Sequence, residues 1–430
     1  MEEFSPQELI GHGALTVGWD GIAISLCMAH RCPLSTQWRV VEYPPPLLAL
    51  RLNKKYQNPS MARTKKPFVI DLFAGAGGLS VGAHQAGASV AASVELDRAA
   101  CETLRANPGY HGVVLETDVT ALTGADLRKS AGLKANDPLV IVGGPPCQPF
   151  SKAAYWTESG KDAAYRRARA SGVQLKRPKP PSVVRPDDRR DLVQEFMRLV
   201  IESKADGFVF ENVPSLKHPR NLPIFEALIA SAKDAGFELD TTSANAARYG
   251  VAQTRERVFV LGARRSKPTI PAPTHALDGE GCLFTRAAVS AGEAFDDLDA
   301  PFEPEEVVSG RWAKHLEEVP PGWNYKAHTA WAGHPNPTFV TETRFWNFLL
   351  KLAATKPSWT LAASPGPWTG PFHWESRRLR TGEMAALQGF PREYSIAGSR
   401  RDRVRQMGNA VPVPLARAMI GSVLEAISVR

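Results

Sequence analysis

Cys147 stands in a short, proline-rich stretch, residues 143–151, which reads GGPPCQPFS. Prolines on both sides restrict the backbone dihedrals, so they hold the sulfur in one place. A lone cysteine is usually a small buried hydrophobic residue. A thiolate is nevertheless a strong nucleophile, even when only a small fraction of the cysteine is ionised. The stiff turn therefore indicates a positioned cysteine nucleophile.

Glu211 and the arginines of residues 253–257 are candidates to assist this nucleophile. Glu211 follows an apolar stretch, and a carboxylate in such a place is either paired with a cation or acts as an acid or hydrogen-bonding group. Residues 253–257 read QTRER, and an extended strand would place Gln253, Arg255 and Arg257 on one face. An arginine beside the carboxylate either forms a structural ion pair with it or donates hydrogen bonds to a polar ring.

A glycine-rich turn in residues 71–80, DLFAGAGGLS, indicates that the backbone approaches a ligand closely. Its spacing differs from the G-x-G-x-x-G of dinucleotide folds, and alone it predicts only a tight strand-to-helix turn. Glu95 and Asp118 end the next two predicted strands and offer acceptors for a ribose and an adenine amino group. Each alone fits a helix cap or a solvated loop. Together they predict a nucleoside site.

These residues follow short apolar segments that predict a parallel sheet. We predict strands over residues 68–73, 89–96, 113–117, 138–142 and 207–210, helices over 79–86, 98–106, 191–203 and 223–235, a late hairpin from 238–243 and 257–261, and further helices at 381–387 and 414–428. Strands alternating with amphipathic helices are typical of βαβ units. Because ligands bind at the carboxyl ends of the strands in open α/β sheets, the candidate residues share one crevice.

Composition changes along the chain predict its organisation. We predict that residues 1–60 form an N-terminal extension, which is either disordered or a start-site artefact. The second alternative arises because the sequence from Met61 reads like a natural start of a protein. Residues 61–265 form the α/β catalytic domain, and residues 376–430 return to it. Residues 266–375 are loop-rich and form a second domain. Six of its residues either contact a partner or form the domain's core: Trp323, Tyr325, Arg344, Trp346, Trp359 and Trp368. For most of the tryptophans we favour the core.

Charge and cysteine usage restrict the class of protein. Lys and Arg outnumber Asp and Glu by 52 to 44, a net charge of +8 that favours an anionic partner without proving one. The 5 cysteines are odd in number, so a disulfide framework is not indicated and we expect a cytoplasmic protein. We expect no membrane span and no signal peptide. Cys27, His30 and Cys32 lack a second ligand pair, so we expect no metal site.

Six motifs in order resemble the DNA cytosine-5 methyltransferase family, from about Pro67 to the C-terminus. They are DLFAGAGG, GGPPCQPFS, ENVPSL, QTRERVFVLG, RRLRTGEMAALQGFP and QMGNAVPVPLA. The resemblance implies a Rossmann-like, S-adenosylmethionine-dependent methyltransferase domain with a smaller, loop-rich target-recognition domain. It also implies a bacterial type II restriction-modification system.

The resemblance implies S-adenosylmethionine as the cofactor and assigns residues to it. Glu95 would bind the ribose and Asp118 the adenine, while Pro146 and Asn409 would complete the pocket. The turn residues that would line the methionine and adenosine are Phe73, Gly75, Gly77 and Gly78. The match at Asn409 implies that the chain returns to its first domain at its end.

The resemblance also implies a reaction on duplex DNA. Cys147 would add to carbon 6 of a flipped-out cytosine, so that carbon 5 can attack the methyl group. Glu211 would hydrogen-bond ring nitrogen 3 and the exocyclic amine, and Arg255 would hold the carbonyl oxygen. Arg257 would support this contact or position the loop. Loss of the proton on carbon 5 then expels the cysteine.

The expected partners are double-stranded DNA and, functionally, a restriction endonuclease; we expect a monomer. Residues 152–186 form a longer loop than is usual in the family, and we favour phosphate contacts over a solvated face for its basic residues: Arg166, Arg167, Arg169, Lys176, Arg177, Lys179 and Arg185. Three rivals stay open: a transfer-RNA cytosine methyltransferase, a catalytically inactive DNA-binding relative and, least favoured, a nicotinamide dehydrogenase.

Overall fold

The largest sheet has seven strands in the computed structural model, which describes residues 66–147, 150, 165, 168, 173, 190–277, 284–340 and 346–428. The strands are β1 (Phe68–Leu72), β2 (Ser89–Glu95), β3 (Val113–Glu116), β4 (Leu139–Gly143), β5 (Gly207–Asn212), β6 (Glu238–Asn245) and β7 (Glu256–Ala263). Each overlaps a predicted strand, and the predicted hairpin is the antiparallel pair β6 and β7. The expected extension, residues 1–60, and all the basic residues named for the loop 152–186 lie outside the described residues.

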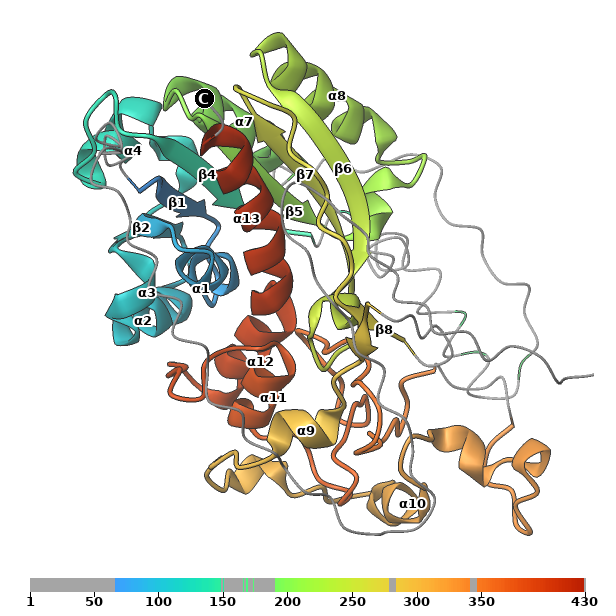
Figure 1. Cartoon of the computed structure of the whole chain (residues 1–430). Coiled ribbons are helices and arrows are strands. Elements are labelled where there is room, and N and C mark those ends of the chain that lie inside the picture. Colours follow the sequence, from blue (N-terminus) through green and yellow to red (C-terminus); the bar gives the residue numbers. More distant parts are fainter. Residues whose placement is uncertain are drawn as a thin grey trace, which may run out of the picture. The chain divides into compact units, whose positions relative to one another are not determined.

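The strand order, β3-β2-β1-β4-β5-β7-β6, creates the crevice (Figure 1). β7 runs antiparallel to both of its neighbours, while the other neighbouring pairs are parallel. The chain order reverses between β1 and β4, and such a switch point opens a binding crevice beyond the carboxyl ends of the strands. The glycine-rich turn follows β1 and Cys147 follows β4, so both lie at this point.

Helices cover both faces of the sheet (Figure 1). The described helices are α1 (Gly78–Gln85), α2 (Arg98–Ala106), α3 (Pro108–His111), α4 (Gly124–Ser130), α7 (Leu192–Glu202), α8 (Leu222–Asp234), α9 (Ala291–Phe295), α10 (Ala313–Glu318), α11 (Thr381–Leu387), α12 (Arg400–Asn409) and α13 (Val413–Ser428). One apolar cluster joins α1 and α13 to Val69 of β1. Another joins α4, α7 and α8 to Ile70. Successive β1 side chains therefore enter opposite cores, and each buried side chain contributes about 1.5–3 kcal/mol.

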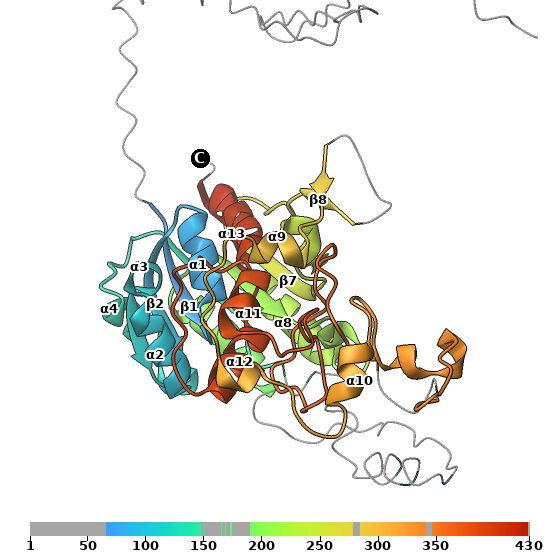
Figure 2. The same cartoon turned by 90° about the horizontal axis from the view of Figure 1, so that it is seen from below.

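The C-terminal helices lie against the N-terminal part of the sheet. α13 packs along α1 and also contacts β4, β5 and β7. α11 and α12 lie side by side, and α12 contacts α2 (Figures 1 and 2). These contacts bring the end of the chain to the strand ends where the glycine-rich turn lies.

Between β7 and α11 the structure has little regular secondary structure. It contains the short pair β8 (His275–Ala276) and β9 (Arg286–Ala287), with α9 and α10. A separate apolar cluster holds part of it together: Leu316, Val319, Tyr325, Phe339, Phe348, Leu349 and Phe372. Tyr325 thus lies in a core, but Trp323, Trp346 and Trp359 are 46%, 52% and 42% exposed. The expectation of core positions was wrong for these three tryptophans, and Arg344 lies outside the described residues.

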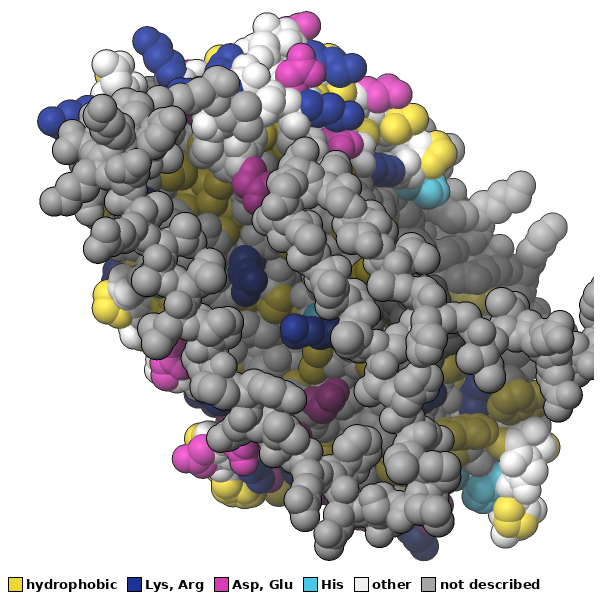
Figure 3. All heavy atoms as spheres, in the orientation of Figure 1, with side chains coloured by type: hydrophobic (Ala, Val, Ile, Leu, Met, Phe, Trp, Pro, Cys, Tyr) yellow, Lys and Arg dark blue, Asp and Glu magenta, His cyan; other side chains and the backbone are white. Residues whose placement is uncertain are grey.

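Within the described part of the chain, no single helix has the length and apolar composition needed to cross a membrane. α12 and α13 meet that test only when taken together, across a bend of 42°. On the face seen in Figure 3, acidic and basic side chains are intermixed in the region of α8, which itself carries exposed Glu226, Lys233 and Asp234. Such mixed charge is typical of a solvated helix face.

Candidate active site

The glycine-rich turn after β1 has a tightly defined backbone. Phe73, Gly75 and Gly77 have φ values of 58°, 54° and 83°. A Cβ atom on Gly77 would lie 2.2 Å from the His111 ring, and one on Gly78 would lie 2.1 Å from the backbone oxygen of Val411. Glycine is therefore needed at both positions, because a larger residue would displace the turn from its neighbours.

Glu95, at the end of β2, holds the turn in place. Its Oε2 atom accepts a hydrogen bond from the Gly75 N–H at 2.7 Å, and Oε1 accepts from the N–H groups of Leu96 and Asp97 at 2.9 and 2.7 Å. An ionised carboxylate has about four lone-pair sites. These three bonds therefore leave capacity for one further donor.

Asp118 caps a turn and also lines a cavity. Its Oδ1 atom accepts from both the N–H and the hydroxyl of Thr120, at 2.9 and 2.8 Å, and so caps the short turn at Val119–Ala121. The same residue lines the cavity described next. Because both capping bonds use Oδ1, Oδ2 is the oxygen available to a ligand.

A cavity of about 510 Å³ joins these groups to the cysteine turn. The predicted site residues that line it are Phe73, Gly75, Gly78, Glu95, Asp118, Pro146, Cys147, Glu211, Arg257 and Asn409. Gly77 and Arg255 do not line it. The volume falls in the range of about 300–1,000 Å³ that is typical of small-molecule sites. The cavity extends from the nucleoside-type residues to the thiol.

Glu211 and Arg257 form a buried ion pair in the wall of this cavity. Glu211 of β5 is opposite Phe259 of β7, so Arg257 lies two residues along the same face. The Arg257 Nε atom is 2.9 Å from Glu211 Oε1, and the side chains are 12% and 9% exposed. Burial raises the pKa of Glu211, while the guanidinium groups of Arg257 and Arg255 oppose the rise.

Cys147 shares this electrostatic environment. Burial raises the pKa of the Cys147 thiol. Arg257 and Arg255 act in the opposite direction because their positive charges favour the thiolate, whereas the Glu211 carboxylate adds to the rise. The Arg257 guanidinium therefore offsets part of the free-energy cost of ionising the partly buried Cys147 thiol.

Arg255 has a different place from the one expected. Its side chain is buried, and its two terminal nitrogens donate to the backbone oxygens of Leu361 and Gly408 at 3.3 and 2.7 Å. The prediction treated residues 253–257 as one strand, but β7 begins at Glu256. Arg255 therefore precedes the strand whose pleat directs the Arg257 side chain toward the cavity. Its own side chain instead holds the backbone of the C-terminal segment through the hydrogen bond to Gly408.

Two contacts that sequence reasoning missed also position the site. The Asn212 side chain donates to the backbone oxygen of Pro145 at 3.1 Å, which ties β5 to the cysteine turn. Arg405 of α12 lines the cavity and binds both carboxylate oxygens of Asp97 at 2.9 and 3.1 Å. Arg405 precedes Asn409 by one helical turn, a spacing that places both on one face of α12. The four-residue spacing from Asn409 was the sequence signal that could have identified Arg405.

An open, mostly parallel α/β sheet with a cavity at its switch point defines the class of fold, which is Rossmann-like. A crystal structure of a candidate DNA modification methyltransferase from an E. coli prophage shares the fold, with a TM-score of 0.55 and 22% identity, over 85% of this chain and 100% of that one.

The family model for C-5 cytosine-specific DNA methylases matches residues 68–167 and 184–425. The type II methyltransferase M.SacI of Streptomyces achromogenes is 37% identical over 388 residues, covering 83% of this chain and 92% of that protein. M.NgoFVII of Neisseria gonorrhoeae, also a type II methyltransferase, is 29% identical and covers 86% and 90%. The chain belongs to the C-5 cytosine-specific DNA methylase family and is a DNA (cytosine-5-)-methyltransferase.

Proposed function

We propose that this protein transfers a methyl group from S-adenosylmethionine to carbon 5 of a flipped-out cytosine within a specific duplex DNA sequence. We further propose that it protects that sequence beside a restriction endonuclease, as type II methyltransferases do in restriction-modification systems. The observation that carries the reaction is that one cavity contains both a nucleoside-type acceptor set and Cys147 beside a buried ion pair.

The residues of the glycine-rich turn and the strand ends fit S-adenosylmethionine. The remaining acceptor capacity of Glu95 suits a ribose hydroxyl, and Oδ2 of Asp118 suits the adenine amino group. Phe73, Pro146 and Asn409 complete the wall. When bound, the cofactor supplies an electrophilic methyl group on a sulfonium centre.

Cys147, Glu211 and Arg257 would act on the base. The Cys147 thiolate adds to carbon 6 of cytosine, which makes carbon 5 nucleophilic enough to accept the methyl group. Glu211, whose pKa is raised by burial and held down by the two guanidinium groups, hydrogen-bonds ring nitrogen 3. Loss of the proton from carbon 5 then restores the ring and releases the thiolate. Because these ring atoms are inaccessible in a duplex, flipping costs roughly a few kcal/mol.

We assign the contact with the cytosine carbonyl oxygen to Arg257 and a bracing role to Arg255, the reverse of the sequence-based expectation. Arg257 lines the cavity, whereas Arg255 does not. Both terminal nitrogens of Arg255 already donate to backbone carbonyls. Arg255 therefore supports the site without touching the base.

The simplest experiment tests which nucleic acid this protein methylates. The purified full chain is mixed with labelled S-adenosylmethionine and either unmethylated duplex DNA or total transfer RNA. We expect label in 5-methylcytosine of the DNA alone. Label found in transfer RNA and absent from DNA would replace this proposal by the RNA enzyme. A folded protein that binds both ligands but transfers no label to either would indicate the inactive DNA-binding relative.

The rate of methyl transfer should rise with pH. Because burial raises the pKa of Cys147, most of it is thiol near neutrality, and the thiolate fraction grows by about tenfold per pH unit below that pKa. We expect single-turnover rate constants with saturating DNA and cofactor to increase correspondingly from neutral to alkaline pH. In Arg257→Gln the rise should extend to higher pH, because a charge that favours the thiolate is gone. A profile that is flat in both proteins would contradict this account.

Gly78→Ala should unfold at a lower temperature and bind S-adenosylmethionine poorly. The new methyl group meets the backbone of Val411, which cannot rotate away, and overpacking of this kind costs about 1–3 kcal/mol. Gly421→Ala is the matched control, because a Cβ there meets no atom within 4 Å and the change should stabilise α13 by about 0.5–1 kcal/mol. Thermal unfolding and calorimetric titration with the cofactor measure both effects; equal behaviour of the two variants would contradict them.

A further inference from the structure

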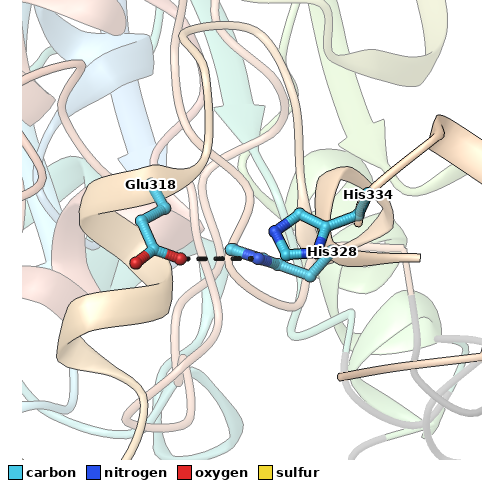
Figure 4. A group of neighbouring side chains, drawn as sticks. All are labelled: Glu318, His328 and His334. Atoms are coloured by element: carbon cyan, nitrogen blue, oxygen red, sulfur yellow. Dashed lines mark ion pairs between the residues drawn. The ribbon is translucent and has the colours of Figure 1, made fainter. Parts of the chain in front are cut away.

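Glu318, His328 and His334 converge from three separate segments of the chain (Figure 4). Glu318 ends α10, His328 ends the 3₁₀ turn Tyr325–His328, and His334 follows the 3₁₀ turn Ala330–Ala332. The Glu318 Oε2 atom lies 3.8 Å from His328 Nδ1, and one ligand atom from each of the three residues lies within 4.8 Å of the others. None of the three lines the cavity of the candidate active site.

The tautomer of His328 leaves a lone pair that faces the carboxylate. His328 is 1% exposed, and its Nε2 atom is 2.7 Å from the backbone oxygen of His315. A carbonyl oxygen only accepts, so Nε2 carries a proton, and Nδ1 is an acceptor in the neutral tautomer that metal binding requires. The distance of 3.8 Å to Glu318 is too long for a direct hydrogen bond. Two acceptors thus face each other across a gap that suits a cation.

The surroundings of His328 fit a metal ligand. A histidine that binds a metal almost always donates its other ring N–H to a carbonyl or carboxylate, as His328 does to His315. The His334 Nδ1 atom is 2.9 Å from the backbone oxygen of Asn336 and 3.2 Å from the Asn336 nitrogen, so it can donate to the first or accept from the N–H of the second. In the tautomer that donates to the oxygen, the lone pair is on Nε2.

His315 borders this group without belonging to it. It lies one turn before Glu318 on α10, and its ring centroid is 5.0 Å from that of His328. The Nδ1 atom of His315 is buried and has no hydrogen-bond partner within the described part of the chain. A buried polar atom without a partner marks a place where a water or an ion belongs.

We propose that Glu318, His328 and His334 bind one divalent transition metal ion, Zn²⁺, with water completing the coordination. Imidazole nitrogens favour zinc and similar metals, whereas Ca²⁺ and Mg²⁺ prefer oxygen ligands throughout. Zinc bonds of about 2.0–2.1 Å need ligand atoms about 3.3 Å apart in a tetrahedron, so the group must close slightly. The Glu318 side chain is 47% exposed and is free to move by that amount.

The ion would act as a structural clamp, remote from the chemistry. It would join α10 to the two turns that follow, in a region with little regular secondary structure and one small apolar cluster. Between His328 and His334 lies Trp331, which is 67% exposed. Lys326, whose Nζ atom lies 5.5 Å from the ring centroids of both Trp331 and Trp346, is on the same loop. The clamp would fix how this surface is presented.

The test compares zinc content and thermal unfolding of the untagged full chain with those of Glu318→Gln and His334→Gln. Both substitutions affect side chains that are not buried, so both variants should fold. After dialysis against zinc, the wild-type chain should hold one equivalent more than either variant, and a chelator should lower its unfolding temperature but not theirs. The difference in zinc content between the wild type and the variants is decisive, because Cys27, Cys32 and Cys147 offer thiols to zinc elsewhere in all of these proteins.

His84→Gln, an exposed histidine on α1, is the matched control and should keep the full zinc content. Cobalt substitution gives a second readout, since a tetrahedral site should show visible absorption that both cluster variants lack. The proposal is overturned if the variants retain as much zinc as the wild type. It is equally overturned if the wild type retains none and its unfolding temperature ignores both zinc and chelator.

Discussion

Cys147→Ala abolishes methyl transfer in our account while S-adenosylmethionine still binds. The substitution removes the sulfur that would add to carbon 6, so carbon 5 is never activated. The groups assigned to the methionine, ribose and adenine follow β1, β2 and β3 and do not include the thiol. Transfer of labelled methyl groups to DNA and calorimetric titration with the cofactor measure the two properties separately.

Two comparisons sharpen this prediction. Cys101→Ala removes a buried thiol in α2 and should keep turnover, although the protein loses some stability. Duplex DNA with 5-fluorocytosine at the target should form a stable covalent complex with the wild type, because the final loss of a proton from carbon 5 is blocked. Cys147→Ala should form none. Wild-type turnover by this variant would remove Cys147 as the nucleophile.

Arg257→Gln should lower the methyl transfer rate by about 10²–10³, the usual effect of losing one donor that stabilises developing charge. The same change leaves Glu211 buried without its ion-pair partner, and breaking such a pair costs about 3–5 kcal/mol of stability. Glu211→Gln combined with Arg257→Gln removes both charges and should recover much of the stability without recovering the rate. Rate constants and denaturant unfolding of the two variants and the wild type separate the two effects.

Arg255→Gln provides the contrast for this prediction. Its guanidinium serves the backbone oxygens of Leu361 and Gly408, so its loss should chiefly reduce the free energy of unfolding, by about 1–3 kcal/mol. The folded fraction should retain more activity than Arg257→Gln does. If Arg255→Gln instead lost the greater part of the rate while remaining stable, Arg255 would be the residue that touches the base.

The sheet was predictable because its strands are short, continuous apolar runs. β1, β4 and β5 are buried on both faces, and such strands are legible without knowledge of their partners. The turns after β1 and β4 were also legible, since their glycines and prolines reflect local backbone demands. These local signals were sufficient to place Gly75, Glu95, Cys147 and Glu211 around one crevice.

The remaining details depend on contacts between distant segments. The roles of Arg255 and Arg257 follow from β7 beginning at Glu256, and strand boundaries are weakly encoded in local sequence. The bond between Asp97 and Arg405 joins residues far apart in the chain. α12 was not predicted, because most of its residues are polar and its position comes from packing on α2 and α11. Exposure of Trp346 and Trp359 likewise depends on the tertiary arrangement.

Bisulfite sequencing of plasmid DNA from a methylation-deficient host that expresses this chain tests the central claim most directly. The same host expressing Cys147→Ala, with matched soluble protein and retained cofactor binding, is the control. We predict protected cytosines that recur in one short sequence motif and are absent with the variant. Unprotected DNA from cells that contain folded, cofactor-binding wild-type protein would contradict sequence-specific DNA methylation by this protein.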